Sequence, residues 1–336
     1  MTAIVTDAHY RMSVSLIRDL FDRGVRVAAC EKASIEAPVG FASRGAAQCV
    51  RLPDEEYEAA LLALCREVLE IEGEKPVLLP VGAKTLAMVS RSRDAFSAVA
   101  GLCAATPSQL TLFNDKAAVS ALAKTLGVPV PESFERQPEE ADEPFFSRVP
   151  LPCAVKPHCG ESFGLTASQR YRICRTKDEL RAAFHHFKAL TNEDPIVQEY
   201  LPGAAYGCSV LAKDGAVYRS LCHRRVREYP TSGGPSTCCE SFYDETLVDH
   251  ALRLLRALHF VGVAMVEFKG NPKDGYKLLE INPRVWGSFP MTLAAGSHFA
   301  EVWARAAAGE RFAMPDTDYV RGKRMFFLLN DAAACL

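Results

Sequence analysis

The sequence predicts an α/β fold in which an N-terminal domain with a parallel sheet precedes a larger α+β region. In the first hundred residues, short apolar runs alternate with segments of helical periodicity. Such alternation is typical of a parallel sheet covered by helices. From Cys153 onward strand-like runs dominate, with a few helical segments between them. This change of pattern predicts that a second, mixed region follows the first domain.

The N-terminal domain is expected to contain three strands and two helices in alternating order. Val14, Ile17 and Phe21, flanked by Leu16 and Leu20, recur at helical spacing, and Gly24 ends that helix. A second helix is expected over 58–71. The strands are expected at 3–6, 25–30 and 75–81.

The second region is expected to begin with a helix that opens at Asn114-Asp115 and ends at Gly127 and Pro129. Residues 135–152 are rich in Pro, Glu and Asp, which indicates an exposed loop or edge. The chain ends soon after an apolar, strand-like run at 325–329, which leaves open whether a C-terminal extension is missing. The remaining strands are expected at 153–157, 171–174, 196–199, 207–213, 216–223, 262–269 and 276–282, and the helices at 178–190, 244–259 and 299–308.

Composition excludes several classes of protein. With 336 residues, of which 49% are hydrophobic and 24% charged, the chain can form two or three domains with real cores. A net charge of -2 argues against a nucleic-acid binder that neutralises many phosphates. The chain does not open with a basic segment followed by an apolar stretch, and it contains no run of 18 apolar residues that could cross a membrane. We therefore expect a cytoplasmic protein that binds neither nucleic acid nor a membrane.

Two local features suggest sites that the rest of the sequence does not support. The twelve cysteines include no CxxC pair, so a reducing compartment with buried thiols is expected, and Cys238-Cys239 has no clustered partner for a metal. Glu31 ends the second strand, where an acidic ribose ligand of a dinucleotide-binding fold would lie. The first turn, from Thr6 to Tyr10, has no glycine to approach a pyrophosphate. We expect Glu31 to be a solvated strand end.

A predicted hairpin late in the chain carries the strongest chemical signal. The strands 262–269 and 276–282 flank a segment rich in turn-forming residues. A regular antiparallel register would place Lys269 opposite Tyr276, and Glu267 diagonally from Glu280, with Asn282 on the same face. Two carboxylates and an amide oxygen are hard ligands that suit Mg²⁺ better than zinc. The alternative is a solvent-exposed strand face with two ordinary glutamates.

A site for a magnesium-bound nucleotide also needs cations for the phosphates. Lys116 lies at the expected helix start, and Lys156 ends a predicted strand. After Lys156, the segment from His158 to Gly164 contains two glycines, whose backbone can approach phosphate oxygens. Either lysine alone is more often a solvated surface residue, so their assignment depends on the metal face.

The order of these motifs resembles the ATP-grasp superfamily, which includes D-alanine–D-alanine ligase, biotin carboxylase and carbamoyl-phosphate synthase. The resemblance covers about residues 105–300. It implies a pre-ATP-grasp domain at 1–110, a small lid subdomain at 111–195 and a C-terminal subdomain with the metal site at 196–336. The motifs that carry it are Asn114-Asp115-Lys116, Val155-Lys156-Pro157, Gln198 to Gly203, Val266-Glu267-Phe268 and Leu279 to Arg284.

The resemblance also implies roles for individual residues. Lys116 and Lys156 match the lysines that contact the ATP phosphates, and Arg284 matches the arginine that steadies the phosphoryl group or a substrate carboxylate. Glu199, Tyr200 and Leu201 match the hinge that meets adenine. Glu267, Glu280 and Asn282 match the Mg²⁺ ligands, with Mn²⁺ as an alternative ion. Ligases of this type are often homodimers.

The chain departs from the family pattern at three places. The phosphate-covering loop reads HCGESFG, which is poorer in glycine than in many members. No acidic residue follows Gly203 to contact ribose, and the first glycine-rich turn of the pre-ATP-grasp domain is absent.

A basic segment is the most informative about substrate. Residues 223–236 resemble the R-x-R…P-x-x-G-G stretch of predicted carboligases close to D-aspartate ligase. On a strand, Arg225 and Arg227 would share a face with His223 and form an anion site. The alternative is a solvated basic edge strand. Trp286 and Phe289 are equally compatible with a substrate pocket and with the core.

These features together predict an ATP-dependent carboxylate–amine ligase acting on small molecules. Lys116, Lys156 and Mg²⁺ would support attack of a carboxylate on the γ-phosphate, and Arg225, Arg227 and Arg284 would hold the acyl phosphate until an amine attacks. The segment around 115–190 would close as a lid. The alternatives are a carboxylase-type ligase with another acceptor, a non-catalytic nucleotide-binding regulator and, from the N-terminal strands, a Rossmann oxidoreductase.

Overall fold

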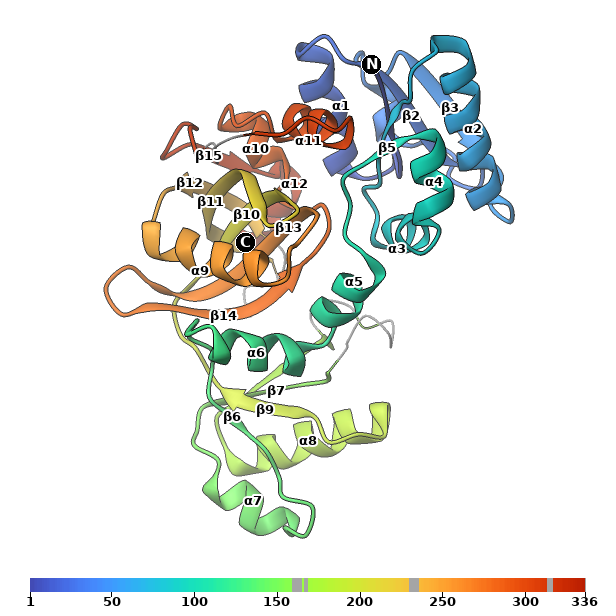
Figure 1. The fold of residues 1–336 in the computed structure, drawn as a ribbon. Coiled ribbons are helices and arrows are strands. Elements are labelled where there is room, and N and C mark those ends of the chain that lie inside the picture. The colour runs from blue at the N-terminus through green and yellow to red at the C-terminus, as the bar shows by residue number, and fades with distance from the viewer. Residues whose placement is uncertain (159–164, 166–168, 230–235, 313–316, 336) are drawn as a thin grey trace.

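The computed structural model describes residues 1–158, 165, 169–229, 236–312 and 317–335. The described chain forms three lobes, each built on one β-sheet (Figure 1). A parallel sheet begins the chain, and two antiparallel sheets follow. This confirms the predicted order of an α/β domain followed by an α+β region.

The first lobe is a five-stranded sheet with the strand order β3-β2-β1-β4-β5. The residues of β1, together with Val27 and Ala29 of β2, are fully buried because helices cover the sheet. On α1 the buried face consists of Leu16, Ile17 and Leu20, whereas Phe21 is 46% exposed. The elements are β1 (Thr2–Val5), α1 (Arg11–Asp22), β2 (Arg26–Lys32), the 3-10 helix Val39–Ala42, β3 (Gln48–Leu52), α2 (Tyr57–Glu72), β4 (Val77–Leu79), α3 (Ala83–Arg91), α4 (Arg93–Val99) and β5 (Gly101–Leu102).

Two helices, α5 (Pro107–Asn114) and α6 (Lys116–Thr125), connect the first lobe to the small one (Figure 1). The start of α6 agrees with its sequence signal, because the Asp115 side chain accepts hydrogen bonds from the backbone of Ala117 and Ala118. Beyond its end, Gly127 adopts a left-handed conformation with φ of +66°. The cap at Asp115 makes Lys116 the first residue of the helix, and Gly127 follows its end.

The small lobe contains a four-stranded antiparallel sheet with the order β6-β9-β7-β8, packed on helix α8. The expectation of an exposed loop over 135–152 is wrong, because this segment contains α7, whose Phe145 and Phe146 are buried against Phe184 of α8. The acidic residues of this segment suggest an exposed loop, although two of its aromatic side chains belong to the core. The elements are β6 (Ser133–Phe134), α7 (Asp142–Arg148), β7 (Cys153–Lys156), β8 (Arg172–Cys174), α8 (Lys177–Thr191) and β9 (Ile196–Glu199).

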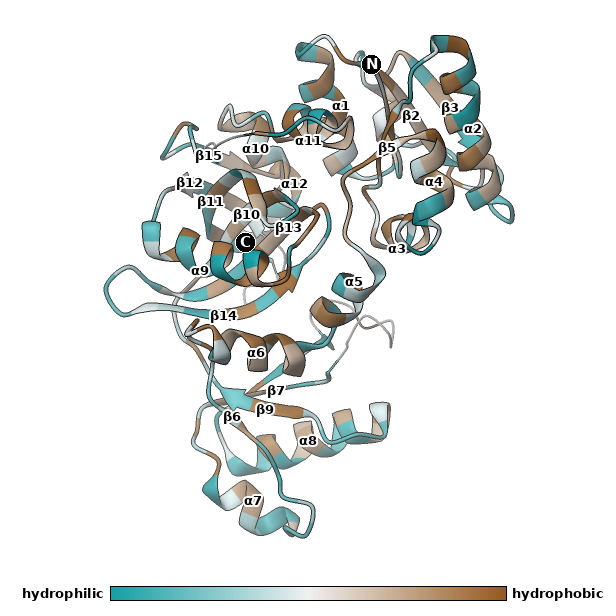
Figure 2. Ribbon diagram, viewed as in Figure 1, coloured by the Kyte–Doolittle hydropathy of each residue, from teal (hydrophilic) through white to brown (hydrophobic). Residues whose placement is uncertain are grey.

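The third lobe is a six-stranded antiparallel sheet with the order β14-β13-β10-β11-β12-β15. The apolar run at 325–329 is only partly a strand, since α12 begins at Leu328. Figure 2 shows that its helix α9 carries both hydrophobic and hydrophilic residues. The elements are β10 (Ala204–Lys213), β11 (Ala216–Glu228), β12 (Ser236–Phe242), α9 (Glu245–Ala257), β13 (Gly262–Asn271), β14 (Gly275–Asn282), α10 (Pro290–Ala294), α11 (Phe299–Ala307), β15 (Arg324–Phe326) and α12 (Leu328–Cys335).

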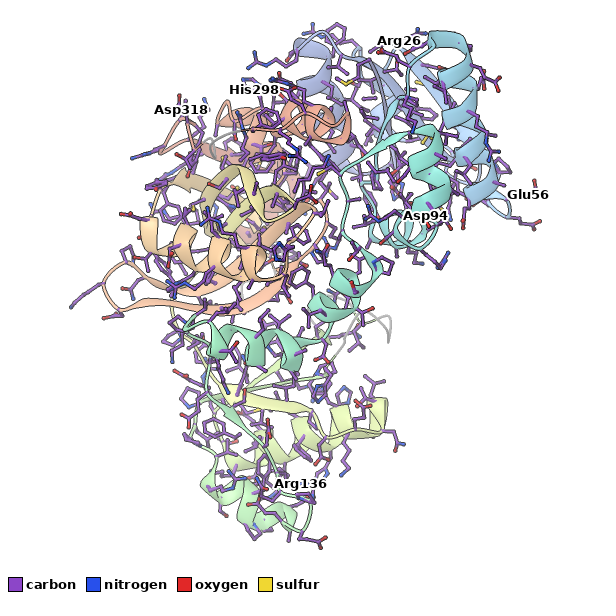
Figure 3. The ribbon with its side chains drawn as sticks, viewed as in Figure 1. Arg26, Glu56, Asp94, Arg136, His298 and Asp318 are labelled. Atoms are coloured by element: carbon purple, nitrogen blue, oxygen red, sulfur yellow. The ribbon has the colours of Figure 1, made fainter. Side chains whose placement is uncertain are left out.

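The first and third lobes share one hydrophobic core, whereas the small lobe has a core of its own. Trp303 of α11 donates its indole N–H to the carbonyl of Cys103 (2.6 Å). Asp19 of α1 accepts hydrogen bonds from His298 Nδ1 (2.8 Å) and from the backbone of Ala300 (2.9 Å) at the start of α11. Figure 3 labels His298 at this junction. The first and third lobes are therefore packed directly against each other.

Within the described residues, no helix is long and apolar enough to cross a membrane. Ten cysteines between Cys30 and Cys239 whose side chains the structure describes are free thiols, and nine of these ten are buried.

Candidate active site

A cavity of about 520 Å³ lies where the three lobes meet. Its wall includes Arg11 and Leu86 from the first lobe, Lys156 and Gln198 from the small lobe, and a continuous stretch of the third lobe from Leu279 to Arg284. The sequence-predicted residues that line it are Lys116, Lys156, Glu199, Tyr200, Leu201, Arg225, Glu267, Glu280, Asn282 and Arg284. The fold thus brings together groups that are up to 168 positions apart in this set, counted from Lys116 to Arg284.

Glu267 and Glu280 face each other directly across β13 and β14. The expected register, with Lys269 opposite Tyr276, is wrong, because Lys269 pairs with Lys277 and the register shifts between Glu267 and Phe268. The extra residue of this β-bulge is Leu279, and together with the one-residue offset at Lys269 it converts the expected diagonal pair into a direct one.

Asn282 joins the two carboxylates. Its Nδ2 donates to Glu267 Oε1 and to Glu280 Oε1, both at 3.1 Å, and its Oδ1 accepts from Arg284 Nη2 at 3.3 Å. Turning the amide about its last side-chain torsion would present Oδ1 to the carboxylates instead. The three oxygen donors then suit a hard divalent cation that keeps waters or takes phosphate oxygens as further ligands. Among the described residues, no group of three or more His, Cys, Asp or Glu gathers as a metal site, so any cation here depends on the amide and on a ligand.

The two glutamates have different electrostatic surroundings. Burial raises the pKa of Glu267, with a further contribution from Glu280, although Arg225 and Arg284 oppose this shift. For Glu280, burial would raise the pKa, but Lys116, the amide of Asn282, Lys156 and Arg225 together lower it. Such opposite shifts of neighbouring carboxyl groups are typical of functional sites. The surroundings therefore favour the ionised form of Glu280 more than that of Glu267.

Two lysines lie beside these carboxylates. Lys116 Nζ is 3.8 Å from Glu280 Oε2. Lys156, the last residue of β7, lines the same cavity, and burial followed by repulsion from Lys116 lowers its pKa to about 7, with partial compensation by Glu280. A lysine in this state gains most from a polyanion, because added negative charge favours its protonated form.

The expected hinge lies at the end of β9. Glu199 forms an ion pair with Lys277 of β14, with Nζ to Oε distances of 2.7 and 2.8 Å. Next to it, the carbonyl of Leu201 accepts from Lys269 Nζ at 3.3 Å, and that ammonium lies 5.6 Å from the centre of the Tyr200 ring. These contacts tie the small lobe to the third lobe at one edge of the cavity.

The two arginines of the basic segment diverge. Arg225 on β11 donates to Glu267 and also contacts Glu228 (3.4 Å), so it lies beside the cluster of Glu267, Glu280 and Asn282. The expectation that Arg227 shares its face is wrong, because two register shifts flank Arg227 in the pairing of β11 with β12. Arg227 instead pairs with Asp331 of α12, with Nε to Oδ1 at 2.8 Å, and in the described structure it is not part of the cavity wall.

His223, expected as a cationic or polar group of this segment, is a buried polar group. It is 1% exposed, and burial together with the charge of Arg225 lowers its pKa to about 3, so it is a neutral imidazole and not a cation. Its Nε2 lies 3.1 Å from the hydroxyl of Ser288, which lines the cavity.

Two other residues of the sequence analysis are settled by burial. Glu31 is 2% exposed and accepts hydrogen bonds from the backbone of His9 (2.8 Å) and of Lys32 (2.9 Å), so the expectation of a solvated strand end is wrong. Trp286 belongs to the core and also lines the cavity, whereas Phe289 packs in the core. Most of the glycine-containing loops, 159–164 and 230–235, lie outside the described residues.

Sequence reasoning missed Arg11 and Ser288, which both line the cavity. Arg11 begins α1 in the first lobe, and neither residue belongs to a recognisable pattern. The sequence signal that could have pointed to Ser288 is its position in the segment 283–288, which directly follows Asn282.

Known proteins are similar to this chain in sequence and in fold. Residues 191–325 match a family model described as ATP-grasp in the biosynthetic pathway with Ter operon. The C-terminal section of the carbamoyl phosphate synthase large chain from Methanopyrus kandleri is 24% identical over 215 residues. That match covers 60% of this chain but only 39% of the relative's length.

Solved structures with the same fold include two kinds of enzyme. A complex of biotin carboxylase with an ATP analogue from Campylobacter jejuni superposes with a TM-score of 0.70 at 15% identity, over 96% of this chain and 73% of that one. An L-amino acid ligase from Bacillus licheniformis superposes with a TM-score of 0.61 at 15% identity, over 92% and 74%. A biotin carboxylase domain from Hydrogenobacter thermophilus, in complex with MgADP and bicarbonate, gives 0.69 at 16% identity, over 96% and 72%.

Proposed function

We propose that this chain, whose residues 191–325 match an ATP-grasp family model, is an ATP-dependent ligase that joins a carboxylate to an amine through an acyl phosphate. The observation that carries this proposal is the convergence of Glu267, Glu280 and Asn282 with Lys116 and Lys156 in one cavity. Carboxylates for a divalent ion and cations for phosphates are the two requirements of phosphoryl transfer.

The first step forms the acyl phosphate. A substrate carboxylate oxygen attacks the γ-phosphorus of ATP, and the bond between that phosphorus and the β-bridging oxygen breaks to release ADP. Lys116 and Lys156 orient the phosphates and offset their charge. Glu267, Glu280 and Asn282 would hold Mg²⁺, which when bound neutralises charge on the phosphate oxygens.

The second step transfers the acyl group. The amine attacks the carbonyl carbon of the acyl phosphate, the bond to the phosphate oxygen breaks, and the nitrogen loses a proton as the amide forms. Arg225 and Arg284 hold the anionic intermediate at the end of the cavity next to Asn282. We do not assign such a role to Arg227, since it pairs with Asp331 outside the cavity wall.

The adenine end of ATP would lie at Glu199, Tyr200 and Leu201, where β9 leaves the small lobe. We propose that residues 111–195 act as a lid that closes over the nucleotide and excludes water, because an acyl phosphate hydrolyses readily in its presence. The separate core of the small lobe supports such a movement.

A second candidate is a carboxylase-type ligase that uses the same ATP site. The similarity to biotin carboxylases, which extends over 96% of the chain, favours it. A non-catalytic nucleotide-binding protein is a weaker candidate, since it would not need two carboxylates, an amide and two lysines around one cavity.

An assay of ADP release separates these candidates. The full chain is incubated with ATP, Mg²⁺ and single amino acids, pairs of amino acids, or bicarbonate, and products are identified by mass spectrometry. The ligase proposal predicts ADP release that depends on an amine, with an amide as product. Turnover that requires bicarbonate and is not stimulated by any amine would favour the carboxylase-type ligase. ATP binding without any turnover would favour the non-catalytic nucleotide-binding protein.

A further inference from the structure

Arg11 is a half-buried cation on the wall of the cavity, and unlike the residues assigned to ATP it comes from the first lobe. It comes from the first turn of α1, and its guanidinium lies 3.5 Å from the centre of the Phe327 ring. This stacking holds the plane of the guanidinium and leaves its edge for hydrogen bonds. Among the described residues no carboxylate forms an ion pair with Arg11, so its charge is not compensated within the described chain.

Ser288 lies next to Arg11 on the same wall. A β-carbon placed on Gly287 would be 3.4 Å from Arg11 Nη2, so the guanidinium approaches the backbone immediately before Ser288. Ser288 is 7% exposed and lines the cavity. Arg11 Nη2 therefore lies close to the backbone that carries Ser288, four residues beyond Arg284 in the chain, and both residues line the cavity.

His223 determines how the Ser288 hydroxyl is used. In the described structure His223 Nδ1 is buried without a hydrogen-bond partner, while Nε2 lies 3.1 Å from Ser288 Oγ. A neutral imidazole carries one N–H, and a buried N–H without an acceptor is more costly than an unpaired nitrogen lone pair. The proton therefore belongs on Nε2, which donates to Ser288 Oγ. The hydroxyl must then donate its own hydrogen elsewhere, and the cavity is the open direction.

The histidine ring is fixed in this position by its surroundings. Gly207 pairs with His223 across β10 and β11, and a β-carbon there would lie 2.4 Å from the ring. Burial and the nearby charge of Arg225 lower the pKa of His223 to about 3, which keeps the ring neutral over the physiological range. His223 is thus a positioning residue for the hydroxyl.

We propose that Arg11 and Ser288 form a second anion subsite, which binds a carboxylate that is not activated and thereby selects an amino acid as the amine substrate. A guanidinium edge and a hydroxyl donor on one wall match the two oxygens of a carboxylate. Arg284, which contacts Asn282, serves the carboxylate that reacts, so the two anion positions are separate in function. This inference rests on the proposed function, because it names the class of its amine substrate.

Binding tests the subsite without requiring turnover. The thermal midpoint of the full chain, with Mg²⁺ and a non-hydrolysable ATP analogue, is measured with each of the twenty L-amino acids and with the matching amine that lacks the carboxylate. We expect at least one amino acid to raise the midpoint while its amine does not. In Arg11→Ala its apparent Kd should rise about 10- to 100-fold, as for a lost charge-assisted pair, while the Kd of the ATP analogue is unchanged. Arg11→Lys should recover part of the affinity, and Ser288→Ala should show a smaller loss.

Arg18 gives a matched control, because it lies on the same helix and is exposed. Arg18→Ala should bind the amino acid as the unmodified chain does. Equal affinity for the amino acid and its amine, no response to any amino acid, or equal losses in Arg11→Ala and Arg18→Ala would overturn the subsite. In the ADP assay, Arg11→Ala and His223→Gln should raise the KM of the amino acid far more than they lower kcat. Arg11-dependent binding without amine-dependent ADP release would retain the subsite and remove the ligase proposal.

Discussion

Glu267 and Glu280 lie directly opposite one another on β13 and β14, with Asn282 Nδ2 3.1 Å from an oxygen of each. Two like charges at this separation are unfavourable unless cations surround them. Lys116 and Arg225 supply part of that charge from other elements. The pair is therefore prepared for a positively charged ligand.

Replacing either glutamate by glutamine should remove metal-dependent turnover. Glu280→Gln keeps the shape of the side chain but loses the charge that the surroundings favour, so we expect kcat to fall about 100-fold or more. Steady-state ADP release at several Mg²⁺ concentrations measures the effect. Glu240→Gln is the control, since Glu240 of β12 pairs with Arg224 of β11 and Arg324 of β15 and does not line the cavity. Full activity of Glu280→Gln would exclude this residue from the mechanism.

ATP affinity should decrease as pH rises above about 7. Burial, followed by the charge of Lys116, lowers the pKa of Lys156 to about 7, so the unliganded protein carries this charge below that pH and loses it above. Bound polyphosphate raises the pKa again, so binding takes up a proton at higher pH. We expect Kd to be nearly constant below pH 7 and to rise by up to about tenfold per unit above it.

Calorimetric titration between pH 6 and 9 checks this dependence. The control is Lys156→Arg, because a guanidinium stays protonated throughout that range. Its Kd should vary less with pH than that of the unmodified chain, since only the titration of ATP itself remains. Identical pH profiles for the two proteins would mean that Lys156 does not contact the phosphates.

Arg225 and Arg227 should separate catalysis from stability. Arg225→Ala leaves Glu267 without its cation in a buried site, and we expect kcat to fall about 100-fold or more. Arg227→Ala breaks the ion pair with Asp331 that holds α12, so we expect a lower thermal midpoint with an unchanged kcat. Comparison of the two variants by ADP release and thermal denaturation tests the divergence of these neighbours on β11. A large loss of kcat in Arg227→Ala at temperatures where it is folded would contradict it.

The core of the small lobe should be a separate unit of stability. Phe184 is buried among Phe145 and Phe146, and Phe184→Ala should destabilise this lobe by about 3–5 kcal/mol. Hydrogen exchange followed by mass spectrometry should show faster exchange in 133–199 but not in the first sheet. Phe21→Ala, at a residue that is 46% exposed, is the control and should leave both regions unchanged. Uniform acceleration over the whole chain would show that the lobes unfold together.

Much of this fold could be predicted from local sequence. The strands over 262–269 and 276–282 and the helix after Asp115 follow from apolar periodicity, turn residues and a cap. The register of the hairpin could not, because nothing in the sequence marks Leu279 as the extra residue of a bulge. A shift of one position reverses the faces of a strand, and for the same reason Arg227 was expected beside Arg225.

The site residues divide along the same line. Glu280, Asn282 and Arg284 lie within one strand and its end, so their proximity is a local property. Arg11 and Ser288 are 277 positions apart and line one cavity only because the first and third lobes pack together. Helix α7 was missed since the segment 135–152 is rich in Pro, Glu and Asp, although Phe145 and Phe146 of this helix are buried.

The shared core of the first and third lobes has a consequence for synthesis of the chain. Ala3 and Leu16 are buried in the same cluster as Trp286 and Trp303, so the apolar face of α1, although it also packs on β1 and β2, is fully covered only when nearly the whole polypeptide has been made. Fragments that end before residue 300 would expose this face and aggregate. The small lobe, which encloses its own core, can form while the rest is still being translated.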